Sequence, residues 1–193
     1  MAYISNKDIV VGQSSCGRNI IVNKITITGS DSNNAPSVYM QASMHASELQ
    51  GNTVIYNLYK YFKNNQPLGD IVLVPMCNPI GQDNFVGAGH HSRFDPVTGD
   101  NWNRFYHTAN VDYVKFVNDH INSRTEIYKK SFEKLLKTDL HKSFEDNKWE
   151  KTRAQRLNMV LQCESQKSDI VLDLHTDSEA ITSGRLHEIK RPI

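Results

Sequence analysis

The chain lacks the features that define several broad classes of protein. Its three cysteines, Cys16, Cys77 and Cys163, include no CxxC pair, which argues against a disulfide framework and against a cysteine-built metal site. This sparse use of cysteine favours a reducing, cytoplasmic compartment. No apolar run approaches the roughly 20 residues that span a bilayer. Residues 1–11 do not show the basic and then apolar pattern of a secretory signal.

Charge of one sign is not in excess either. Lys and Arg total 22, Asp and Glu total 21, and the net charge is +1. The sequence therefore gives no electrostatic reason to expect a nucleic acid or a membrane as a partner. Apolar residues make up 38% of the 193 residues, which is within the globular range and excludes wholesale disorder. The length is that of one ordinary domain, or of a larger domain cut short.

Apolar patterning predicts an α/β domain. Strands are expected at 8–11, 19–28, 37–42, 70–75 and 169–174, and the last two are continuous apolar runs of the buried, parallel type. Helices are expected within 54–62, 111–136 and 149–167, where apolar residues recur every three or four positions. Strands that alternate with helices predict a mostly parallel sheet, with ligand sites at the carboxyl ends of its strands. The Gly- and Pro-containing stretch 78–106 is expected to be a long loop, either functional or disordered.

Two of the expected strand ends carry a histidine. His45 lies just past strand 37–42, His175 ends strand 169–174, and Glu48 follows His45 by three residues. Two imidazoles and one carboxylate with an open fourth position form a known catalytic zinc set. Taken singly, His45 could be a surface or capping residue, Glu48 a first-turn helix carboxylate and His175 a polar strand end. Their coincidence at parallel strand ends favours a metal site.

Three further groups lie close to this set in the expected fold. Asp173, on the same face as His175, either orients a metal ligand or is a buried carboxylate paired elsewhere. Arg93 and Arg104 lie in the long loop, and Asn103 precedes Arg104. Arginine binds carboxylates with two parallel hydrogen bonds, and near zinc it could stabilise an oxyanion. The alternative for either arginine is an exposed residue that tethers the loop.

Several motifs occur in an order known from one enzyme superfamily. The chain opens with Gly12-Gln13-Ser14 and Gly17-Arg18-Asn19-Ile20, and continues with His45-Ala46-Ser47-Glu48, Asn78-Pro79-Ile80-Gly81, Asn103-Arg104 and Asp173-Leu174-His175. Over about residues 10–178 the chain resembles the zinc carboxypeptidases of the M14 superfamily, which includes the succinylglutamate desuccinylase/aspartoacylase branch. The ordered set of motifs is specific, whereas any one of them alone is not.

The resemblance implies a fold, a cofactor and a set of roles. The implied fold is a three-layer α/β/α domain with a mixed, mostly parallel sheet. One Zn²⁺ per chain would be held by His45, Glu48 and His175. Asn103 and Arg104 would bind the substrate's free carboxylate, and Arg93 would polarise the scissile carbonyl. The implied reaction is hydrolysis of an amide bond beside that carboxylate.

The substrate class stays open between two branches. The HASE and NPxG motifs and the lead-in favour a peptide carboxypeptidase. Glu48-Leu49-Gln50-Gly51 and the short chain favour the branch that acts on N-acyl amino acids. A small peptide or an N-acyl amino acid is therefore the expected partner.

The sequence departs from the family beyond His175. The family's general base is a glutamate on a later strand, and neither Glu179 nor Glu188 can be assigned to that role by position. We expect residues 1–193 to be a single, incomplete catalytic domain, truncated or frameshifted at its C-terminus, with a helical insertion at 107–148. The residues after Ala180 lack strand character, so the strand ending at His175 would be an exposed edge that could drive self-association.

Two rival interpretations come from other classes. The chain could be a non-catalytic zinc-binding fragment or pseudo-enzyme that retains the zinc triad without the base. It could also be a plain α/β domain in which the motif matches are accidental.

Overall fold

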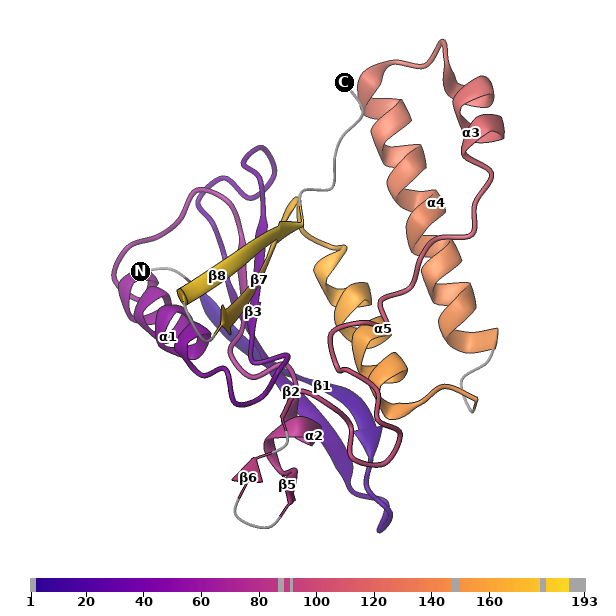
Figure 1. The fold of residues 1–193 in the computed structure, drawn as a ribbon. Helices are drawn as coiled ribbons and strands as arrows, with labels where there is room; N and C mark the ends of the chain where they lie inside the picture. The colour runs from indigo at the N-terminus through magenta and orange to yellow at the C-terminus, as the bar shows by residue number, and fades with distance from the viewer. Residues whose placement is uncertain (1–2, 87–88, 91, 147–149, 178–179, 188–193) are drawn as a thin grey trace.

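Six strands form one sheet in the computed structural model, which describes residues 3–86, 89–90, 92–146, 150–177 and 180–187 (Figure 1). Their spatial order is β1-β2-β4-β3-β7-β8. The strands are β1 (Ile4–Gln13), β2 (Asn19–Ile27), β3 (Val38–Ala42), β4 (Ile71–Val74), β7 (Ile170–Asp177) and β8 (Ala180–His187). A separate two-stranded sheet joins β5 (Phe85–Val86) to β6 (Gly89–His90) inside the long loop.

The sheet is mixed, as the resemblance implies, but the prediction that it is mostly parallel is wrong, because only its centre is parallel. β3 runs parallel to both β4 and β7, whereas β1, β2 and β8 are attached by antiparallel pairing. β3 and β4 are joined through the helix α1 (Gln50–Phe62), the kind of crossover that parallel neighbours require. The carboxyl ends of β3 and β7 therefore lie side by side at one edge of the sheet.

Helices cover both faces of the sheet and give the predicted three layers. α1 packs on one face, where Ile55 joins Ile27, Leu73 and Leu174 in a buried cluster. α5 (Arg153–Ser165) covers the other face with the fully buried Leu157 and Leu161. Burying a leucine side chain stabilises a fold by about 1.5–3 kcal/mol, so these two apolar faces are the main attachment of the helices.

The remaining helices lie in the loop regions between β4 and α5. α2 (Pro79–Gln82) is a single turn after β4, and Asn78 caps it by accepting a hydrogen bond from the backbone N–H of Gly81. α3 (Tyr113–His120) and α4 (Thr125–Asp146) occupy most of the expected insertion 107–148 and extend away from the sheet (Figure 1). Within the residues that the structure describes, no helix is both long and apolar enough to cross a membrane.

Two strand predictions are wrong. β1 is longer than the expected 8–11, because Ile4 to Gln13 pair with Ile27 to Asn19 although many of their side chains are exposed and give no apolar signal. β8 forms from residues expected to lack strand character, pairing with β7 from Val171↔His187 to Asp177↔Ala180. Backbone pairing with a neighbour can stabilise a strand that its own composition does not predict. β7, the strand that contains His175, is therefore internal, and the outer strands of the described sheet are β1 and β8.

Candidate metal centre

The register of two parallel strands brings the predicted histidines together. Ala42 in β3 pairs with Leu174 in β7, so the chain reaches His45 and His175 at the same edge of the sheet. Between β3 and His45 the backbone turns sharply at Ser43, whose φ of 62° is unusual for a residue other than glycine. The Ser43 hydroxyl holds this turn by donating to Asn52 Oδ1 at 2.5 Å, on the first turns of α1.

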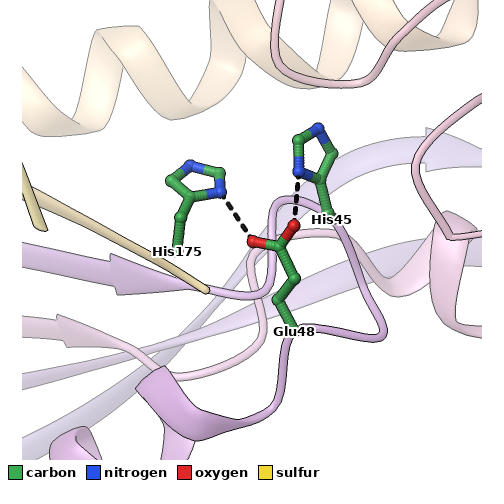
Figure 2. A group of neighbouring side chains, drawn as sticks. All are labelled: His45, Glu48 and His175. Atoms are coloured by element: carbon green, nitrogen blue, oxygen red, sulfur yellow. Dashed lines mark hydrogen bonds and ion pairs between the residues drawn. The ribbon is translucent and has the colours of Figure 1, made fainter. Parts of the chain in front are cut away.

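Glu48 lies between the two histidines and contacts both of them (Figure 2). Its Oε1 is 2.9 Å from His45 Nδ1, and its Oε2 is 2.9 Å from His175 Nδ1. The backbone N–H of Thr176 also donates to Oε2, at 3.1 Å. All three side chains are buried. Glu48 precedes α1, which begins at Gln50, so the alternative of a first-turn helix carboxylate is wrong.

These contacts shift the pKa values of Glu48 and His175. Burial disfavours the charged Glu48, but hydrogen bonds from His175, His45 and the Thr176 N–H outweigh burial and hold the pKa of its carboxyl well below the usual range. Burial also disfavours a charged His175, yet hydrogen bonds to Asp173 and Glu48 raise its pKa to about 9. The same contacts thus favour the charged forms of both side chains.

The donor set fits a zinc ion. His45, Glu48 and His175 each offer one ligand atom, and these three atoms all lie within 4.8 Å of one another. Zinc bound at about 2.0–2.1 Å in a tetrahedral set requires ligand atoms about 3.4 Å apart, a separation within this upper limit. Both histidines direct Nδ1 toward Glu48 and Nε2 toward another acceptor, as metal-bound histidines do.

Two neighbouring side chains accept these Nε2 protons. Asp173 Oδ2 is 2.9 Å from His175 Nε2, which is the contact expected if Asp173 orients a metal ligand. Asn101 Oδ1 is 3.1 Å from His45 Nε2 and also accepts from the backbone N–H of Asn103 at 2.9 Å. The Asn103 amide nitrogen lies 3.1 Å from His175 Nε2. The loop therefore contacts both histidines.

The two arginines identified in the sequence contact different groups. Arg93 reaches the group and donates to Glu48 Oε1 at 3.0 Å, while about half of its side chain is exposed. Arg104 is exposed and donates to the backbone carbonyl of Asn103 at 2.7 Å. Arg93 therefore contacts the candidate metal centre directly, whereas Arg104 lies beside Asn103 in the loop with an exposed side chain.

α5 fastens the loop that carries these groups. Arg153 forms an ion pair with Asp95, which is fully buried. The Asn158 side chain donates to the carbonyl of the buried Trp102 at 2.6 Å. One turn further, Gln162 accepts from the backbone N–H of His107 and donates to its carbonyl. Three positions on one helix thus fix the loop from residue 95 to residue 107.

Sequence reasoning missed Asn101, Ser43 and Asn158. Asn101 stands two residues before Asn103, and that spacing in a loop gave no signal of a contact with His45. Asn158 had a weak signal, since a polar residue sits on the otherwise apolar face of the predicted helix 149–167. The possible bases Glu179 and Glu188 lie outside the described residues.

Comparisons with known proteins point to the family branch that the sequence motifs resemble. The family model of the succinylglutamate desuccinylase/aspartoacylase catalytic domain matches residues 34–192. A provisionally named succinylglutamate desuccinylase/aspartoacylase from Shewanella frigidimarina NCIMB 400 is 36% identical, with a TM-score of 0.86, over 92% of this chain and 47% of that one. A succinylglutamate desuccinylase/aspartoacylase family protein from Shewanella amazonensis SB2B is 35% identical, with a TM-score of 0.84, over 90% of this chain and 47% of that one.

A more distant structure shares the fold alone. An aspartoacylase family protein from Mesorhizobium loti is 19% identical, with a TM-score of 0.53, over 91% of this chain and 41% of that one. No curated protein sequence matches the chain. The chain spans about half the length of the relatives it resembles.

Proposed function

Because the chain belongs to the succinylglutamate desuccinylase/aspartoacylase catalytic-domain family, we propose that it carries a zinc-dependent centre for hydrolysis of an amide bond beside a free carboxylate. The observation that supports this most directly is the convergence of His45, Glu48 and His175 in one buried group. N-acyl amino acids are the favoured substrates, because both the family and the two relatives above 30% identity are named for that branch. Peptides with a free C-terminus are the second choice.

Each residue near the centre has a chemical role in this proposal. His45, Glu48 and His175 would hold the zinc, which when bound lowers the pKa of a water and polarises a carbonyl. Asp173 and Asn101 accept the outer Nε2–H groups and so keep Nδ1 of each imidazole directed at the centre.

The loop side chains would position the substrate. Asn103 offers an amide beside His175, and Arg104 offers an exposed guanidinium next to Asn103, a combination suited to a carboxylate. Arg93, already 3.0 Å from Glu48, is close enough to place positive charge beside the oxygen of a reacting carbonyl. No general base is assigned among the residues that the structure describes.

Metal content tests the proposal first. We expect elemental analysis of the zinc-replete protein to give about one zinc per chain, with the zinc lost in His175→Ala. The matched control is His141→Ala, which removes an exposed histidine on α4 and should keep the zinc. Absence of zinc from the wild-type protein, or equal zinc in both variants, would contradict the proposed site.

Activity is the second test. The zinc-loaded chain is assayed with N-acetyl and N-succinyl amino acids and, in parallel, with dipeptides that carry a free C-terminus. Release of the amino acid from the first group supports the favoured branch. Zinc binding without hydrolysis of either group would support the alternative of a non-catalytic zinc-binding fragment or pseudo-enzyme.

A further inference from the structure

Next to the candidate metal centre, residues 93–102 of the long loop fold back on themselves as a short hairpin. The backbone N–H of Asp95 donates to the carbonyl of Asp100 at 2.7 Å, and Phe94 pairs with Asn101 in an antiparallel bridge. The Asp95 side chain is fully buried and is held by an ion pair from α5. The hairpin is therefore anchored to the body of the fold.

Side chains alternate between the two faces of this hairpin. Phe94 and Asn101 oppose each other across the bridge, so their side chains lie on the same face, with Cβ atoms about 5 Å apart. Their neighbours Asp95 and Trp102 lie on the other face and are fully buried. Asn101 Oδ1 is 3.1 Å from His45 Nε2, so the face that carries Phe94 is the one that adjoins the metal centre.

A second apolar side chain, Leu49, lies in a segment that runs beside Phe94. Ser47 and Ser92, each two positions before one of these side chains, contact each other through their hydroxyls. One position before them, a carboxylate and a guanidinium form an ion pair at 3.0 Å. Leu49 is 49% exposed and Phe94 is 48% exposed. The metal centre is thus bordered on this side by two apolar side chains that a ligand can cover.

The proposed substrate contacts divide the centre into two sides. Asn103, which would bind the carboxylate of the amino acid, lies 3.1 Å from His175 Nε2. Arg93, which would polarise the scissile carbonyl, lies on the other side and contacts Glu48. In an N-acyl amino acid, the acyl group is attached to the carbonyl carbon opposite the amino acid. A substrate bound in this way directs its acyl group past Arg93, toward the two apolar side chains.

The charges on this acyl side are already paired. In the part of the chain that the structure describes, Arg93 is the only lysine or arginine that contacts Glu48. A succinyl group would bring a second carboxylate next to Glu48, and Arg93 cannot serve both that carboxylate and the scissile carbonyl. An apolar acyl group requires no cation, and it would remove Leu49 and Phe94 from water.

We propose that this site selects N-acyl amino acids whose acyl group is apolar, aromatic or branched aliphatic, and that Phe94 determines this preference. The inference rests on the proposed function, which supplies the positions of the substrate carboxylate and carbonyl. It adds a substrate class, since it favours apolar acyl groups over acetyl and succinyl.

Three N-acylglycines that differ in the acyl group test the substrate class. N-phenylacetylglycine, N-acetylglycine and N-succinylglycine are titrated into the zinc-loaded chain, and NMR gives the dissociation constants and any hydrolysis from the same samples. We expect N-phenylacetylglycine to bind about five- to tenfold more tightly than N-acetylglycine, because its ring packs on Phe94. N-succinylglycine should bind no more tightly than N-acetylglycine. Equal affinities, or tightest binding of N-succinylglycine, would overturn the inference.

Variants of Phe94 test its role in the preference. Phe94→Ala should bring the ratio of the phenylacetyl and acetyl dissociation constants close to unity, because the ring contact is lost. Phe94→Lys adds a cation and should make N-succinylglycine the tightest ligand. The matched control is Tyr61→Ala, which removes an exposed aromatic side chain in the last turn of α1 and should keep the wild-type ratio. An unchanged ratio in Phe94→Ala would reject the role of Phe94.

Zinc content, measured on every variant, separates this inference from the proposed function. If zinc is bound and N-acetylglycine binds as tightly as N-phenylacetylglycine, the apolar acyl side is wrong and the proposed function stands. If the chain takes up no zinc, or if the zinc-loaded chain binds none of the three compounds, the proposed function fails and this inference fails with it.

Discussion

At the scale of single residues, Asn101 links the metal centre to the loop. Its Oδ1 accepts from both His45 Nε2 and the Asn103 backbone N–H, so one side chain orients a proposed ligand and positions a proposed substrate contact. Groups that hold the outer nitrogen of a metal-bound histidine commonly affect metal affinity 10–100-fold.

Asn101→Ala is therefore expected to weaken zinc affinity by about tenfold or more, while leaving the three proposed ligands in place. Competition with a chromogenic zinc chelator measures the change. Asn33→Ala, in the exposed turn before β3, serves as the control and should keep wild-type affinity. An unchanged affinity in Asn101→Ala would mean that Asn101 does not orient His45.

Ser43 contributes backbone geometry rather than charge. Its φ of 62° is readily adopted by glycine and strongly disfavoured for β-branched residues. We expect Ser43→Val to be less stable than Ser43→Gly by about 2 kcal/mol, since both lose the hydrogen bond to Asn52 and only valine adds backbone strain. Urea unfolding of the two variants measures the difference. Equal stabilities would show that the turn relaxes without cost.

The sequence could predict the three proposed ligands because parallel strand ends and local spacing determine their positions. His45 follows an apolar strand, His175 follows the largely apolar first residues of β7, and Glu48 is close to His45 along the chain. Asn101 could not be found in this way. Its contact with His45 depends on how the loop folds over the sheet edge, and that path is set by tertiary contacts with α5 rather than by local pattern.

At the scale of elements, α5 determines the position of the loop. The buried Asp95 has its charge balanced by Arg153 at the start of that helix. Arg153→Ala would leave the carboxylate without its cation, and because the Arg153 side chain is partly exposed we expect a loss of stability of about 1–3 kcal/mol. Arg156→Ala, one turn further along α5, should cost little. Denaturant unfolding measures the free energy of unfolding of both variants, and an equal loss in the two would contradict the role of the ion pair.

α1 approaches the sheet closely because it contains Gly51. A Cβ at this position would lie 2.9 Å from the Cβ atoms of both Ala42 and Leu174. Helix propensity alone predicts that Gly51→Ala stabilises the helix by about 1 kcal/mol. We expect the opposite sign, a loss of about 1–3 kcal/mol, because the added methyl group overpacks the interface. Gly12→Ala, where the nearest atom is 3.9 Å away, is the control for thermal unfolding.

The elements that sequence patterning missed are those that depend on partners. β8 gains its strand conformation from pairing with β7, and the polar part of β1 gains it from β2. By contrast, β4 and β7 contain continuous apolar runs, and α1 and α5 have apolar faces that bury against the sheet. These elements could be predicted because their own residues carry the signal.

At the scale of the whole molecule, the proposed metal centre joins parts that are remote in the chain. His45 and Glu48 stand between β3 and α1, and His175 lies 127 residues beyond Glu48, in β7. A metal bound by all three would crosslink the centre of the sheet at the point where the loop also contacts it. Such a crosslink would add the free energy of metal binding to the free energy of folding.

Zinc should therefore raise the unfolding temperature measurably. A ligand that binds only the folded state at 100 times its dissociation constant stabilises it by about 2.7 kcal/mol, which for a domain of this size corresponds to roughly 5–11 °C. Thermal unfolding in zinc and in excess EDTA gives the shift for the wild type. His175→Ala should show almost none of it, whereas His141→Ala should retain it. A shift of equal size in His175→Ala would mean that zinc stabilises the chain at another site. That result would contradict the proposed crosslink between β3 and β7.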